Sequence, residues 1–112
     1  MRYLLMLCGS VGDDALETDI TEPCRAWGEE MTRRGLRVND MGLRPPESAT
    51  AVRVRDGEAL LTDGPFAETK EQIGGSTILE CESREQAVEA AKTHPWAAIG
   101  TIEVRELLEP VS

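Results

Sequence analysis

The sequence predicts a single α+β domain, a ferredoxin-like sandwich with an added β-hairpin. The first observation is the spacing of apolar residues along the chain. It predicts, in order, a strand, a helix, a strand, a hairpin, a strand, a helix and a strand. The second is size, because 112 residues with 40% apolar and 29% charged side chains suit one globular domain over residues 1–112. We therefore expect two helices packed on an antiparallel or mixed sheet.

The first expected strand spans residues 2–8, RYLLMLC. Alternation places Leu4, Met6 and Cys8 on one face and Tyr3, Leu5 and Leu7 on the other. Both faces are apolar, yet two short helices can cover only one face of the sheet. We therefore expect a second copy to cover the other face, giving a homodimer with a cleft between or beside the two sheets.

The first helix is expected after an acidic loop that runs through Asp19, with Thr21 as its N-cap and Gly35 at its end. Its apolar stripe recurs at helical spacing and consists of Ile20, Cys24, Trp27 and Met31. A strand over residues 36–41 should follow. Trp27 is interpreted as a core residue.

A hairpin is predicted over residues 50–62, with strands 50–55 and 58–62. Asp56-Gly57 between them indicates a type I′ turn, because both turn positions favour positive φ. We expect Val52 and Val54 to face the core, and Arg53 and Arg55 to face outward.

The last third should contain a strand over 76–81, a helix from Ser83 and a strand over 99–107. Gln86, three residues after Ser83, completes a capping box. The packing face of this helix is Ala87, Val88, Ala90 and Ala91, and His94-Pro95 should end it. Ile102 and Val104 share one face of the last strand. Gly74-Gly75 indicates a bulge or a close backbone approach.

Residues 60–75, LLTDGPFAETKEQIGG, resemble the DGPF branch of the YCII-related family. The resemblance extends to RYLLMLC, to the helix containing WGEEM, to GLRPP, to TAVRVRDGEALLTDGPF and to HPWAAIGTIEVREL, and so covers nearly the whole chain. It implies a dimeric α+β barrel with ferredoxin-like protomers. It also implies an enzyme, because family members share an aspartate and a histidine, and an association of DGPF-type relatives with alternative sigma factors.

By position, the family aspartate is Asp63. The family histidine lies near the first helix, where residues 13–28 here contain none, and the only histidine is His94. Asp63 and His94 are therefore the candidate catalytic residues. Asp63 is also interpretable as a turn residue that caps a short helical turn over 66–72. His94 is also interpretable as a residue of the last helical turn that interacts with the helix C-terminus.

A small organic ligand is expected in a cleft near Asp63, with Asp63 as base and His94 or an arginine as electrostatic partner. Candidate ligand-binding residues are Arg44, Arg53, Phe66 and Arg105. Arg53 and Arg105 are expected on the sheet face opposite Ile102 and Val104, where arginine forks match carboxylates. Alternatively, they form ion pairs with Glu103 or Glu58. The alternative function is a non-enzymatic accessory or regulatory module that contacts a sigma factor, and a third is a stable dimer whose site is vestigial.

The formal net charge of −9 argues against binding to nucleic acid and to anionic membranes. No apolar run reaches the roughly 20 residues of a membrane span. Cys8, Cys24 and Cys81 are odd in number and include no C-x-x-C, so we expect neither disulfides nor a metal site. No cofactor motif is found. These features predict a cytoplasmic protein.

Overall fold

The computed structural model describes residues 1–10, 20–44, 46–64 and 71–108. Its elements are, in order, β1 (Arg2–Ser10), α1 (Thr21–Arg33), β2 (Arg37–Gly42), the 3-10 helix η2 (Pro46–Ser48), β3 (Thr50–Arg55), β4 (Glu58–Asp63), β5 (Glu71–Glu80), α2 (Arg84–Lys92), the 3-10 helix η3 (Pro95–Ala98) and β6 (Thr101–Glu106). The predicted α+β class is confirmed.

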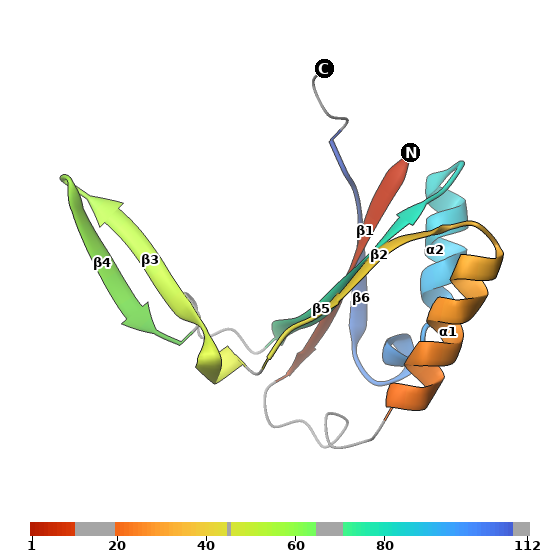
Figure 1. The fold of residues 1–112 in the computed structure, drawn as a ribbon, viewed down its shortest axis with the longest axis horizontal. Coiled ribbons are helices and arrows are strands. Elements are labelled where there is room, and N and C mark those ends of the chain that lie inside the picture. Colours follow the sequence, from red (N-terminus) through yellow and green to blue (C-terminus); the bar gives the residue numbers. More distant parts are fainter. Residues whose placement is uncertain (11–19, 45, 65–70, 109–112) are drawn as a thin grey trace.

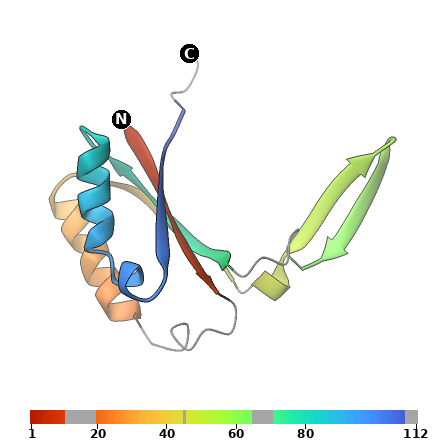
Figure 2. The ribbon, with the colours of Figure 1, turned by 180° about the vertical axis from the view of Figure 1, so that it is seen from behind.

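The main sheet has the strand order β2-β5-β1-β6, and every neighbouring pair is antiparallel. Both α-helices cover the same face of this sheet (Figures 1 and 2). One helix follows β1 and the other follows β5, so the arrangement is compatible with a ferredoxin-like fold. The opposite face carries no helix among the described residues, and we call it the open face.

The core lies between the helices and the covered face. Tyr3 and Leu5 on β1 and Leu79 on β5 are buried there. Leu4 and Ile78, which are register partners, alternate onto the open face and are only half-buried. The first strand is therefore apolar on both faces, as expected. The remaining core side chains are Trp27, Met31, Leu36, Cys81, Ala87, Ala90 and Ala91.

Helix α1 is joined to the end of α2 through Trp27. Its indole Nε1–H is shared between the Ala90 carbonyl oxygen at 3.1 Å and Thr93 Oγ1 at 3.0 Å. Trp27 is thus a core residue, as predicted. The expected N-cap is off by one position, because the Ile20 carbonyl already accepts the first helical bond from Cys24 N–H at 2.9 Å and Thr21 is the first helical residue.

Helix α2 begins as predicted, since Ser83 Oγ accepts from Gln86 N–H at 3.2 Å. It ends earlier than expected, at Lys92. His94 does not occupy its last turn but is the N-cap of η3, an element that the sequence patterns did not predict. Strand β6 presents Ile102 and Val104 toward the core, as expected.

Strands β3 and β4 pair with each other as a separate two-stranded sheet. This hairpin, which we call the arm, extends away from the main sheet and the helices (Figures 1 and 2). Its turn has Asp56 at φ 52° and Gly57 at φ 81°, as a type I′ turn requires. The prediction that Val52 and Val54 face the core is wrong, because the arm does not join the main sheet. Val52 is 63% exposed and Val54 is likewise exposed.

Strand β5 begins at Glu71, five residues before the expected start. The helical turn predicted over 66–72 therefore cannot include Glu71 or Gln72, and the rest of it lies outside the described residues. Gly74-Gly75 forms a β-bulge, and the backbone of β5 approaches that of β2 closely there, as predicted. Leu7 pairs with Gly75 and Cys8 with Ile73, which skips Gly74. A Cβ on Gly75 would lie 2.7 Å from the Met41 carbonyl oxygen.

Candidate functional site

His94 is held at the junction of α2, η3 and α1. Its side chain is only 5% exposed. The imidazole Nδ1 accepts a hydrogen bond from Trp96 N–H at 3.0 Å, which caps η3. The ring also contacts Trp27 edge-on, with ring centroids 4.5 Å apart. Trp96 is itself fixed, because its Nε1–H donates to the Cys8 carbonyl oxygen at 2.8 Å.

His94 also lines a cavity, and its other ring nitrogen, Nε2, is not fully buried. Because Nδ1 accepts from Trp96, the neutral ring carries its proton on Nε2. Nε2 has no hydrogen-bond partner among the described residues. Every fully buried side-chain nitrogen or oxygen of those residues does have a partner. Nε2 must therefore reach accessible space, and His94 lines a cavity of about 240 Å³. The site thus presents a fixed N–H donor.

The walls of this space, which we call the His94 cavity, come from α1, β1, β2 and β5. They are formed by Leu7, Cys24, Trp27, Asp40, Met41, Gly42, Gly74, Gly75 and His94. Its volume lies just below the roughly 300–1,000 Å³ of sites for drug-sized ligands. The cavity therefore has room for a small organic molecule, with apolar side chains and two polar groups of different character around it.

Asp40 supplies the carboxylate of the His94 cavity. Its Oδ1 accepts the Thr77 hydroxyl hydrogen at 2.8 Å, and Arg37 Nη2 lies 3.4 Å from its Oδ2. The side chain is 46% exposed, so it remains accessible to a ligand while the buried Thr77 fixes its orientation. Asp40 and His94 thus place an acceptor and a donor on one cavity.

Burial sets the protonation state of two groups in the cavity. Desolvation lowers the pKa of His94 below its usual value, and the nearby Asp40 carboxylate opposes this shift without reversing it. His94 is therefore neutral at pH 7. Burial and then Asp40 raise the pKa of the Cys24 thiol, so Cys24 stays protonated and is not an activated nucleophile. The chemistry available here is hydrogen bonding and proton transfer by Asp40 and His94.

Comparison with known proteins places this chain in a family. The model of the YCII-related domain matches residues 1–110. The chain belongs to the YCII-related family. An uncharacterized protein of Rhizobium meliloti (strain 1021) is 39% identical over 67 residues, which cover 58% of this chain and 54% of that protein. The chain thus aligns with about half the length of the curated relative it matches.

Among the described residues of this YCII-related chain, the other candidates do not line the His94 cavity. Asp63 ends β4, is exposed and pairs in register with Thr50 on the arm. Arg53 is also on the arm, so its predicted place on the main sheet is wrong. Arg105 is on β6 opposite Leu4, on the open face as expected. Arg44 is exposed beyond β2, and Phe66 lies outside the described residues.

The structure therefore does not bring Asp63 and His94 together within one chain. The carboxylate that shares a cavity with His94 is Asp40, which the sequence patterns missed along with Thr77. One signal was available for Asp40. Aspartate is depleted in strands, so its presence within the expected strand over 36–41 is unusual. The catalytic roles predicted for Asp63 and His94 stay predictions.

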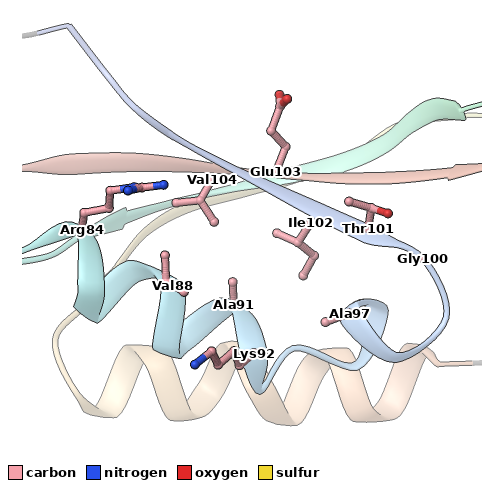
Figure 3. A pocket seen from close by; sticks show the side chains of 10 residues that line it. All are labelled: Arg84, Val88, Ala91, Lys92, Ala97, Gly100, Thr101, Ile102, Glu103 and Val104. Carbon is pink, nitrogen blue, oxygen red and sulfur yellow. The ribbon is translucent and has the colours of Figure 1, made fainter.

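A second hollow, of about 600 Å³, lies between α2 and β6 (Figure 3). Its apolar lining is Val88, Ala91, Ala97, Ile102 and Val104. Arg84 and Lys92 extend from α2, and Lys92 is paired with Glu89 at 2.8 Å. Glu103 points away from the helix (Figure 3). No histidine is among the described residues that line this groove, so the His94 cavity, which has both a histidine and a carboxylate, is the stronger candidate site.

Among the described residues, no helix is both long and apolar enough to cross a membrane.

Proposed function

We propose that the chain binds a small organic ligand in the His94 cavity and catalyses proton transfer on it. The single observation that carries this proposal is the cavity that His94 and Asp40 both line, where the Nε2–H of His94 has no partner among the described residues and the Asp40 carboxylate is accessible. This corresponds to the acid–base interpretation of the sequence, with Asp40 in the position that Asp63 was expected to hold.

The roles follow from the chemistry of the two groups. Asp40 is the base, since a carboxylate oxygen at the cavity wall can accept a proton from bound ligand. Neutral His94 donates a hydrogen bond from Nε2 to a ligand oxygen and stabilises negative charge that develops there. The apolar cavity walls favour an uncharged organic molecule over an inorganic ion.

A screen of small organic molecules by thermal shift tests the proposal. A molecule that stabilises the wild type should lose its effect on His94→Gln and Asp40→Asn. Asp63→Asn is the matched control, because it is also a carboxylate-to-amide change but lies on the arm. If Asp63→Asn abolishes binding while Asp40→Asn does not, the ligand site is near Asp63 and the assignment to the His94 cavity is wrong.

We also propose the finer assignments that the sequence suggested: the DGPF branch of the family, a homodimer and a dimeric α/β barrel. The homodimer is supported by the open face, where Leu4, Met6 and Ile78 are incompletely covered by their own chain. A second copy would remove these side chains from water. Association with a sigma factor stays a prediction from the resemblance alone.

A further inference from the structure

We propose that the arm is a dimerisation element whose apolar face packs on the open face of a second copy. This inference rests on the proposed homodimer and adds the contact that holds it together. Neither the sequence patterns nor the family match assigns the arm a role in contacts between copies.

The arm has one largely apolar face and one face of mixed character. Val52 pairs in register with Leu61 and Val54 with Ala59, so these four side chains share a face. On the other face, Arg53 pairs with Leu60. Leu61 is 69% exposed, and Val52 and Val54 are also exposed. Within the described part of the chain, this apolar face is therefore exposed to solvent.

An arm of this kind is not expected to be stable by itself. A two-stranded hairpin is marginally stable in water without a helix or further strands against it. Both views show the arm extended away from the rest of the chain (Figures 1 and 2). The radius of gyration is 16.0 Å, whereas a compact domain of this length has about 13 Å. Packing against another molecule would supply the missing burial.

A second copy is the partner that best fits this surface. The chain itself offers a second incompletely covered apolar surface, the open face, where Met41 and Ile73 are exposed beside half-buried Leu4 and Ile78. In a two-fold dimer whose open faces meet, each arm packs on part of the open face of the other copy, so one arrangement buries both apolar surfaces in both copies. Stable interfaces take about 20 to 30 residues per side, which the arm and the open face supply together and neither supplies alone.

The charges of these surfaces permit two acidic chains to meet. On the open face, Arg2 pairs with Glu80 at 3.3 Å. Arg105 and Glu103 lie on the same face of β6, two residues apart. On the arm, Arg53 and Arg55 offset two of the three carboxylates of Asp56, Glu58 and Asp63. The excess negative charge of the chain, −9 in total, is therefore not concentrated on the surfaces where the two copies would touch.

Sedimentation and light scattering on matched variants test the arm. Val52→Ser with Leu61→Ser removes one cross-strand pair from the apolar face, and Arg53→Ser with Leu60→Ser is the control pair on the other face. We expect the first variant to raise the dimer dissociation constant at least about tenfold, because both arms of the dimer are altered. The control should stay within about threefold of the wild type. Near-ultraviolet circular dichroism of Trp27 and Trp96, both outside the arm, checks that the core is folded.

Photo-cross-linking locates the contact directly. A photoreactive phenylalanine analogue in place of Leu61 should join two chains and attach to a peptide of β1 or β5 from the second copy. If the wild type is monomeric at high concentration, both the homodimer and the arm contact are refuted. If it is dimeric but the apolar-face variant dimerises equally well, or cross-links form elsewhere, the homodimer stands and the arm contact is wrong. Cross-links only to an unrelated protein in cell extract would also overturn the second copy as partner.

Discussion

The hydroxyl of Thr77 donates to Asp40 Oδ1 across 2.8 Å, between register partners on β5 and β2. Thr77 is 1% exposed, so this hydroxyl has no access to water. The bond therefore connects the buried centre of the sheet to the accessible carboxylate of the His94 cavity. This hydrogen bond explains how the exposed side chain of Asp40 can hold one orientation.

Thr77→Val should destabilise the protein by about 1 kcal/mol, since it removes one net hydrogen bond at nearly constant shape. Ligand affinity should fall as well, because Asp40 loses its fixed orientation. Urea denaturation and the thermal-shift screen measure the two effects. Thr77→Ser keeps the hydroxyl and should retain ligand binding. Equal ligand affinity in Thr77→Val and the wild type would show that this bond does not position Asp40.

The stability of the protein should depend on pH through His94. Burial lowers the pKa of the folded ring, whereas the unfolded ring titrates near about 6.5. The unfolded chain therefore takes up the proton first as the pH falls. The neutral ring makes its full contribution to the free energy of unfolding above about pH 6.5. This contribution is lost as the pH falls toward the pKa of His94 in the folded protein. The free energy of unfolding should fall between pH 7.5 and pH 5.5, and this fall should be larger in the wild type than in His94→Gln. If the fall is the same in both proteins, His94 is not a buried neutral ring.

The close approach of β2 and β5 should make Gly75 intolerant of a side chain. A Cβ there would lie 2.7 Å from the Met41 carbonyl oxygen. Gly75→Ala should cost about 1 to 3 kcal/mol by forcing the strands apart. Its register partner Gly42 is the control, because a Cβ added there would meet no atom within 4 Å among the described residues. Comparable losses in Gly42→Ala and Gly75→Ala, measured by urea denaturation, would contradict this explanation.

Local signals made much of the fold predictable. Ser83 and Gln86 mark the start of α2 because the cap is a bond between residues three apart. Asp56-Gly57 marks the arm because the turn itself demands positive φ. The direction in which Val52 points was not predictable in this way. Alternation separates two faces of a hairpin, but only tertiary placement decides whether either face meets the core.

The candidate site was only half predictable for the same reason. His94 was identifiable as the single histidine, but its η3 cap depends on Trp96 and its cavity depends on β2 and β5. Asp40 reaches that cavity through sheet pairing with a strand far along the chain. No sequence spacing connects these residues. The DGPF segment drew attention to Asp63 through its resemblance to the family motif, which carries no information about the neighbours of Asp63 in space.

Long-range ¹H–¹⁵N spectra of the His94 ring, recorded with and without a screened ligand, test the central claim most directly. The chain has one histidine, so the signals need no assignment. We predict a neutral ring protonated on Nε2 at pH 7, with the Nε2 signal shifting on ligand binding in the wild type and in Asp63→Asn. A charged ring, a proton on Nδ1, or a bound ligand that leaves the ring signals unchanged would contradict the account.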